Sequence, residues 1–277
     1  MTGYLGKLEG AGVIQTLDKM VKAMDSTEQF TGLASIYAGA RPSYPPDALD
    51  YILRECRLRE GDVLVDVGCG TGISSRLFAE RGLSVIGIEP NADMLQSAKS
   101  SVSHFPSLDL QFRRGKAEDT GLAESCAHAV LCAQSFHWFD AEMALCEFWR
   151  ITKTNGWVIL MWNVRDNSDA FTKGYGDCFK KVLGDEKKAH DRHRDGEAIL
   201  SHPLFFDGKK MTFDNSQQVN AHSLLMRSFS ASYAPREEPK RSELEADLNE
   251  LFKQYERRGA ATLRYQTVIY LSRKLER

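Results

Sequence analysis

An acidic side chain and a glycine-rich loop follow one another at the end of an apolar run. Asp66 lies in the apolar run at 63–67, and three glycines follow within residues 68–72. A second apolar run, at 84–89, ends in Glu89. A strand, a glycine loop, a helix and a strand tipped by an acid form one βαβ unit, which binds a nucleoside at the carboxyl ends of parallel strands. We expect loop N–H groups to approach a ligand closely and Glu89 to accept both ribose hydroxyls.

The spacing of the glycines in this loop distinguishes between several classes of nucleotide-binding site. A dinucleotide fingerprint reads G-x-G-x-x-G, whereas here Gly72 comes one position early and Ile73 stands where the last glycine belongs. The Gly-Lys-Ser/Thr of a phosphate loop is absent. Asp66 would repel a pyrophosphate and suits a cationic ligand, such as an ammonium or a sulfonium. The structural alternative is that Asp66 bonds to loop amides and that Glu89 is a helix-start acid.

These motifs resemble those of class I S-adenosylmethionine (SAM)-dependent methyltransferases, and the match covers about residues 30–170. It is carried by the segments 66–72, 89–91, 115–118 and 133–138. The resemblance implies SAM as cofactor and S-adenosylhomocysteine (SAH) as product. The cofactor-binding residues that we expect are Tyr37, Arg41, Asp66, Gly68, Cys69, Gly70, Glu89, Pro90, Met94, Ala117, Glu118 and Gln134.

A finer similarity points to the small-molecule branch that includes trans-aconitate methyltransferases. It is carried by the segments 37–45, 136–139, 162–166, 230–235 and 264–270. By this resemblance the acceptor is a small molecule, methylated at oxygen or nitrogen, with a carboxylate as one option. The substrate-binding residues that we expect are Phe136, Trp138, Trp162 and Asn163. The three aromatic rings could form a wall for an apolar or planar acceptor, although ordinary core packing explains each one singly as well.

His137 is the candidate catalytic residue, because it follows the predicted fourth strand and has a usable pKa. Methyl transfer chiefly needs proximity and alignment, and a base is needed only when the acceptor must lose a proton. The alternative role of His137 is structural, holding the loop between two aromatic neighbours. His190 and His193 have no third ligand at a matching spacing, so we expect no metal site.

The composition describes an ordinary globular chain. It has 277 residues, 42% of them apolar and 27% charged, and a formal net charge of −2. That balance gives no reason to expect a nucleic acid or a membrane as partner. The six cysteines lack paired metal spacing, which favours reduced thiols in the cytoplasm. We expect a monomer or a homodimer.

Alternating patterns predict the elements that position these residues. The fold class is α/β, a Rossmann-like, seven-stranded, mostly parallel sheet flanked by helices. Predicted strands are 63–67, 84–89, 108–113, 128–133, 157–163, 209–218 and 261–271, with a turn at 154–156. Predicted helices are 72–81, 91–103, 140–152, 220–228 and 240–257.

The predicted division has four parts: an N-terminal helical extension or lid (1–36), a SAM-binding core (37–163), a helical insertion over the substrate (164–208) and a C-terminal completion of the sheet (209–277). The amphipathic helix at 11–25 in the first part either buries its own apolar stripe or acts as a lid or dimer contact.

Three other functions remain open from the sequence. The chain could bind SAM without transferring a methyl group, or it could methylate RNA or protein. The neutral charge argues against a nucleic-acid substrate. An NAD-dependent oxidoreductase is the third alternative, and the loop spacing disfavours it.

Overall fold

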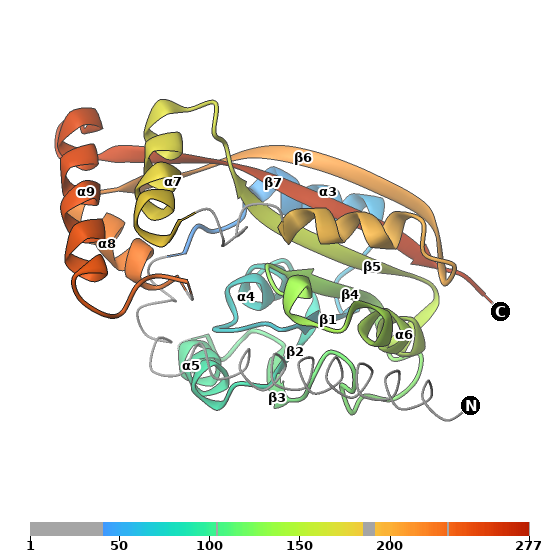
Figure 1. Cartoon of the computed structure of the whole chain (residues 1–277). Coiled ribbons are helices and arrows are strands. Elements are labelled where there is room, and N and C mark those ends of the chain that lie inside the picture. Colours follow the sequence, from blue (N-terminus) through green and yellow to red (C-terminus); the bar gives the residue numbers. More distant parts are fainter. Residues whose placement is uncertain (1–40, 104, 185–191, 232, 277) are drawn as a thin grey trace, which may run out of the picture.

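The fold is a single twisted sheet with helices on both faces (Figure 1). The computed structural model describes residues 41–103, 105–184, 192–231 and 233–276. Its strands run in the order β3-β2-β1-β4-β5-β7-β6. They are β1 (Val63–Val67), β2 (Ser84–Glu89), β3 (Leu110–Arg114), β4 (Ala127–Ala133), β5 (Thr152–Arg165), β6 (Phe205–Val219) and β7 (Ala261–Lys274). Strands β1 to β5 are parallel and β7 is antiparallel to both of its neighbours, which confirms the predicted Rossmann-like sheet.

The helices form three groups. One sheet face is covered by α3 (Pro46–Glu55), α4 (Ile73–Ala79) and α5 (Ala92–Val102), and the other by α6 (Ala141–Ile151) and the 3-10 helix η2 (Arg192–Leu200). A short 3-10 turn, η1 (Phe136–Trp138), follows β4. The third group lies together beyond one end of the sheet (Figure 1) and comprises α7 (Ala170–Leu183), α8 (Ala221–Phe229) and α9 (Lys240–Tyr255).

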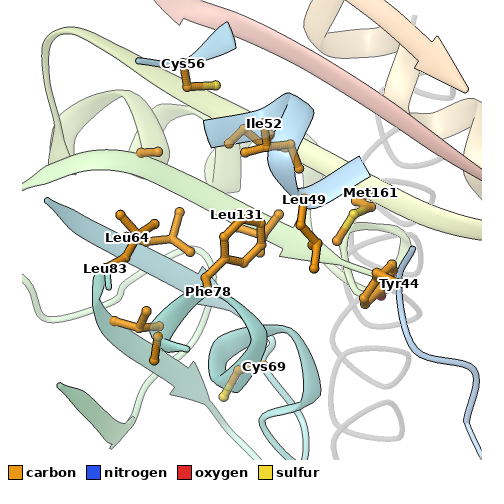
Figure 2. Packing of buried hydrophobic residues seen from close by; sticks show 14 of the residues in the cluster. Tyr44, Leu49, Ile52, Cys56, Leu64, Cys69, Phe78, Leu83, Leu131 and Met161 are labelled. Carbon is orange, nitrogen blue, oxygen red and sulfur yellow. The ribbon is translucent and has the colours of Figure 1, made fainter. Parts of the chain in front are cut away.

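Three hydrophobic cores correspond to these groups. Figure 2 shows part of the first, in which Ile52 of α3 and Phe78 of α4 pack against Leu64 and Leu131 of the sheet. The second core lies on the opposite face, beneath α6. The third joins α7, α8 and α9 to the beginning of β7, through Tyr265 among others. The helices beyond the sheet therefore have a core of their own.

Local sequence signals explain where the helices begin. Pro46 occupies the first turn of α3, where the missing N–H costs nothing. Asn91 caps α5 by accepting hydrogen bonds from the backbone of the first turn, and Asp140 and Asp169 do the same for α6 and α7. Asn220 and Ser223 form a reciprocal capping box at α8.

The predicted turn at 154–156 is wrong, because β5 already begins at Thr152 and runs through these residues. The pairing with β4 jumps from Ala127–Thr152 to Ala129–Trp157, so the extra residues form a bulge. Asn155 has a φ of 60°, a left-handed conformation that asparagine tolerates. The turn-type residues therefore mark an irregularity inside a strand.

Other predicted elements shift less. The third strand starts at Leu110, two residues later than expected. In the predicted insertion, α7 packs against α9 of the C-terminal part, so these segments share one core. The predicted helix at 11–25 lies outside the described residues. Within the described ranges, every helix is too short or too polar to cross a bilayer.

We predict that Gly87→Ala destabilises the fold by about 1–3 kcal/mol through overpacking. A Cβ at Gly87 of β2 would collide with the ring of Phe112 on β3 and lie 2.9 Å from Sγ of Cys69. Urea unfolding measures the cost. In a Phe112→Ala background the same substitution should cost much less, and an equal cost in both backgrounds would contradict this packing.

Candidate functional site

The glycine loop between β1 and α4 depends on left-handed backbone conformations. Gly68, Gly70 and Gly72 have φ values of 67°, 57° and 81°. A Cβ at Gly68 would lie 2.6 Å from Cβ of Ser135, so this glycine also permits close approach of the segment after β4. At Gly70 a Cβ would meet no atom of the described residues within 4 Å, so the described part of the chain leaves this side of the loop open.

Glu89, at the carboxyl end of β2, accepts a hydrogen bond from this loop. Its Oε2 accepts a hydrogen bond from the N–H of Gly70 (2.8 Å), and its Oε1 accepts one from the N–H of Asn91 (2.9 Å). Burial raises the pKa of Glu89, while these two hydrogen bonds oppose the shift. Each carboxylate oxygen keeps a second lone pair, so the group can still accept two ribose hydroxyls.

The loop amides are engaged within the protein, which differs from the expectation that they approach a ligand. The N–H groups of Gly68 and Cys69 both donate to the carbonyl of Ile88, at 2.8 and 3.1 Å. The N–H of Gly70 donates to Glu89. Three consecutive amides thus fix the loop to the end of β2, and the open side of Gly70 is what remains for a ligand.

Asp66 is fully buried under the loop and holds the start of α4. Its Oδ2 accepts hydrogen bonds from the hydroxyls of Ser74 (2.7 Å) and Ser75 (2.6 Å). Its Oδ1 is buried and has no hydrogen-bond partner among the described residues. Burial raises the pKa of Asp66 to about 6 against the opposing serine bonds. Asp66 therefore positions the start of α4 through Oδ2, in place of the bonds to loop amides that the structural alternative proposed, and its predicted contact with the cofactor stays a prediction.

The residues predicted to border an adenine differ in exposure. Met94 of α5 and Ala117 are buried, whereas Pro90 and Glu118 are half-buried. Oε1 of Glu118 accepts a hydrogen bond from the N–H of Asp140 (2.9 Å), the residue that caps α6. These placements leave the predicted adenine contacts as predictions.

The segment after β4 is fixed to both neighbouring strands. Gln134 has a φ of 64°, and its N–H donates to the carbonyl of Met161 on β5 (2.8 Å). The hydroxyl of Ser135 donates to the carbonyl of Val67 at the end of β1 (2.7 Å). The predicted site segments after β1 and β4 are thereby brought together.

His137 is paired with Trp162 across the ends of β4 and β5. The indole N–H of Trp162 donates to Nδ1 of His137 (3.4 Å). Because an indole can only donate, Nδ1 of His137 is the acceptor in this bond. This bond favours the structural alternative for His137, since the lone pair of Nδ1 is already engaged.

The three rings of the predicted aromatic wall differ in how deeply they are buried. Phe136 is almost completely buried and packs against Phe139 and Phe148, so it is a core residue. Trp162 is buried with its ring edge toward Tyr270. Trp138 is half-buried and packs beside His137. Of the three rings, Trp138 keeps the most exposed surface for an acceptor.

Asn163 belongs to a polar network at the end of β5. Its Oδ1 accepts hydrogen bonds from Thr267 (2.6 Å) and Asn215 (3.0 Å), and its Nδ2 donates to the carbonyl of Ser43 (3.2 Å). A direct contact of Asn163 with an acceptor stays a prediction.

Arg41, predicted to bind the cofactor, donates from Nη2 to the carbonyl of Ser230 at the end of α8 (3.2 Å). This bond ties the segment before α3 to the helices beyond the sheet. Tyr37 lies outside the described residues.

Sequence reasoning missed the hydroxyl groups that fix the site. Ser74 and Ser75 bind Asp66, and Ser135 binds the end of β1. The available signal was a pair of serines in the first turn of the helix after the loop, where buried hydroxyls usually satisfy a buried acceptor. Among the described residues, no three His, Cys, Asp or Glu side chains gather as metal ligands, and His190 lies outside them.

Comparisons with known proteins agree with this arrangement. Residues 65–160 match the family model described as a methyltransferase domain. An uncharacterised methyltransferase of Schizosaccharomyces pombe is 31% identical, covering 78% of this chain and 84% of its own. A second, methyltransferase-like protein of that yeast is 31% identical, covering 86% and 92%. A structure from Anaeromyxobacter dehalogenans, provisionally named a type II methyltransferase, shares the fold with a TM-score of 0.61 at 19% identity, covering 84% and 97%.

We predict that Asp66 makes the stability of this protein fall as pH rises. Its folded pKa of about 6 exceeds the ordinary value of 3.8. Between these values the folded chain binds more protons than the unfolded chain, so the free energy of unfolding decreases with pH. From pH 5 to pH 8 the loss through this group should be roughly 1.4 kcal/mol, since one pKa unit corresponds to about 1.36 kcal/mol.

Urea unfolding at the two pH values measures this loss. Asp66→Asn cannot ionise and should lack it, whereas Asp109→Asn, at an exposed position, should keep it. Parallel pH dependence in the wild type and Asp66→Asn would contradict the assignment.

Proposed function

We propose that this chain, which belongs to the SAM-dependent methyltransferase family, transfers a methyl group to an oxygen or nitrogen atom of a small molecule. The observation that carries the small-molecule part is the helical cap on the sheet. The helices α7, α8 and α9 share a core with the start of β7, and that part of β7 pairs with the carboxyl end of β5. A cap built onto this edge favours an enclosed acceptor over an extended polymer.

The residues around the glycine loop fit the cofactor. Glu89 keeps lone pairs for the ribose hydroxyls, and the open side of Gly70 leaves space beside them. The unpartnered Oδ1 of Asp66 adds negative charge beneath the loop when the group is ionised, which suits a cationic ligand. When bound, SAM supplies a methyl group that is already activated for displacement. The protein then has to align the acceptor and exclude water.

The described residues around His137 support an acceptor that needs little help from a base. Its Nδ1 accepts the indole N–H of Trp162, so we assign His137 a positioning role beside Trp138. A carboxylate oxygen is nucleophilic without losing a proton, whereas a hydroxyl or an ammonium group must lose one. A carboxylate is therefore the acceptor option that these contacts favour, and it agrees with the similarity to the trans-aconitate branch.

We predict that Glu89→Gln weakens SAM and SAH binding by at least about tenfold. The amide loses one acceptor and turns its NH₂ group toward the backbone N–H of Gly70 or Asn91. Hydrogen bonds to a charged group contribute about 1.5–3 kcal/mol, and about 1.4 kcal/mol is a factor of ten in affinity. Isothermal titration calorimetry of both ligands measures the effect.

The matched control is Glu80→Gln, an exposed glutamate that follows the last residue of α4 and pairs with Arg76. It should bind both ligands as the wild type does. Undiminished affinity in Glu89→Gln, or no binding of SAM and SAH by the wild type, would contradict the assigned site.

We predict that His137→Asn lowers kcat by less than about tenfold, because loss of a true general base typically costs 10²–10⁴-fold. The measurement is the pH dependence of kcat with an acceptor found by screening small carboxylic acids, phenols and amines. His137 would instead be the base if kcat of the wild type rose with pH around the pKa of a histidine, if this dependence were absent in His137→Asn, and if the variant lost about 10²–10⁴-fold in kcat. Intact SAM binding with no methylated product would favour a protein that binds SAM without transferring the methyl group.

A further inference from the structure

An arginine of the helical cap is buried, and the described part of the chain offers it no carboxylate. Arg227 on α8 is only 6% exposed. Among the described residues, its buried Nε and Nη1 atoms have no hydrogen-bond partner, and no carboxylate forms a salt bridge with it. An unpaired buried cation is costly, so proteins rarely keep one without a compensating partner.

The surroundings of Arg227 are aromatic and polar but uncharged at neutral pH. Its guanidinium interacts with the phenols of Tyr265, Tyr175 and Tyr233, and no carboxylate is among these groups. The hydroxyl of Tyr175 accepts a hydrogen bond from Ser228 (3.3 Å), and burial raises the pKa of Tyr175. None of these phenol and hydroxyl groups neutralises the positive charge of Arg227.

A second arginine interacts with the same tyrosine. The guanidinium carbon of Arg165 is 5.3 Å from the ring centre of Tyr175. Arg165 is the last residue of β5 and pairs with Tyr265 on β7. Tyr175 thus interacts with two guanidinium groups near the end of β5.

This cluster adjoins the part of the molecule assigned to the acceptor. Asn163, one of the predicted substrate-binding residues, lies two residues before Arg165 on β5, so both side chains project from the same face of the sheet. On α8, the hydroxyl of Ser230 donates to the carbonyl of Arg227, and the carbonyl of Ser230 accepts from Arg41. The arginine cluster is therefore continuous with the segments that follow β5 and precede α3.

We propose that Arg227 binds an oxyanion group of the methyl acceptor, a carboxylate or a phosphate. The planar guanidinium fork matches either group in a bidentate way, and neighbouring phenols can donate further hydrogen bonds. This group is distinct from the atom that is methylated, since a bound guanidinium would weaken a nucleophile. The inference rests on the proposed function, because it names the charge of the acceptor at that same site.

The first test is stability without any acceptor. Arg227→Met removes the charge but keeps an unbranched stem, so its melting temperature should equal or exceed that of the wild type. The matched control is Arg241→Met, an exposed arginine stacked on Phe229 of α8. A lower melting temperature for Arg227→Met than for Arg241→Met would assign Arg227 a structural role and overturn the proposal.

The second test uses defined anions in the presence of saturating SAH. Small mono- and dicarboxylic acids, each paired with its uncharged amide, and inorganic phosphate are titrated while the melting temperature is followed. We expect acids or phosphate to raise the melting temperature of the wild type and Arg241→Met, but not of Arg227→Met. A response to acids alone identifies a carboxylate, and a response to phosphate alone identifies a phosphate ester.

In this second test, two outcomes overturn the proposal: no anion stabilises the wild type, or Arg227→Met responds as the wild type does. A further variant, Arg227→Lys, keeps the charge without the fork and should need at least tenfold more anion, and equal affinity would also overturn the proposal. SAH binding is measured in every variant. Its absence in the wild type means that the proposed function has failed, whereas intact SAH binding without an anion response means that only this inference has failed.

Discussion

The hydrogen bonds between the glycine loop and the end of β2 are the constraint on which the site depends. Three loop amides are bound by the carbonyl of Ile88 and the carboxylate of Glu89. Such bonds require the left-handed conformations at Gly68 and Gly70, which other residues adopt only at a cost. The loop is therefore preformed, and a ligand meets a surface that needs no reorganisation before binding.

Further hydrogen bonds connect the ends of the neighbouring strands. Ser135 joins the segment after β4 to the end of β1, and Gln134 joins it to β5. Asp66 joins β1 to α4 through two serine hydroxyls. Hydrogen bonds thus join the ends of three neighbouring strands to one another at one edge of the sheet.

The sequence predicted the sheet well because its strands are short apolar runs that alternate with amphipathic helices, and this pattern depends on local spacing. It misplaced the start of β5 because Thr154, Asn155 and Gly156 have turn chemistry, whereas a bulge depends on the neighbouring strand. It placed Glu89 correctly at the end of the second strand, yet it could not show that Asp66 is buried or that Phe136 belongs to the core. Those features depend on which side chains meet in three dimensions, as do the pairing of His137 with Trp162 and the burial of Arg227.

The separate core of α7, α8 and α9 has a consequence for how such a protein can change. Mutations that reshape those helices alter side chains packed mainly on one another and on the beginning of β7. The loop bonds at Glu89 and Ile88 belong to a different packing unit, so they need not be disturbed. The glycine loop and the sheet core can therefore stay constant through evolution while the helices beyond the sheet diverge in sequence.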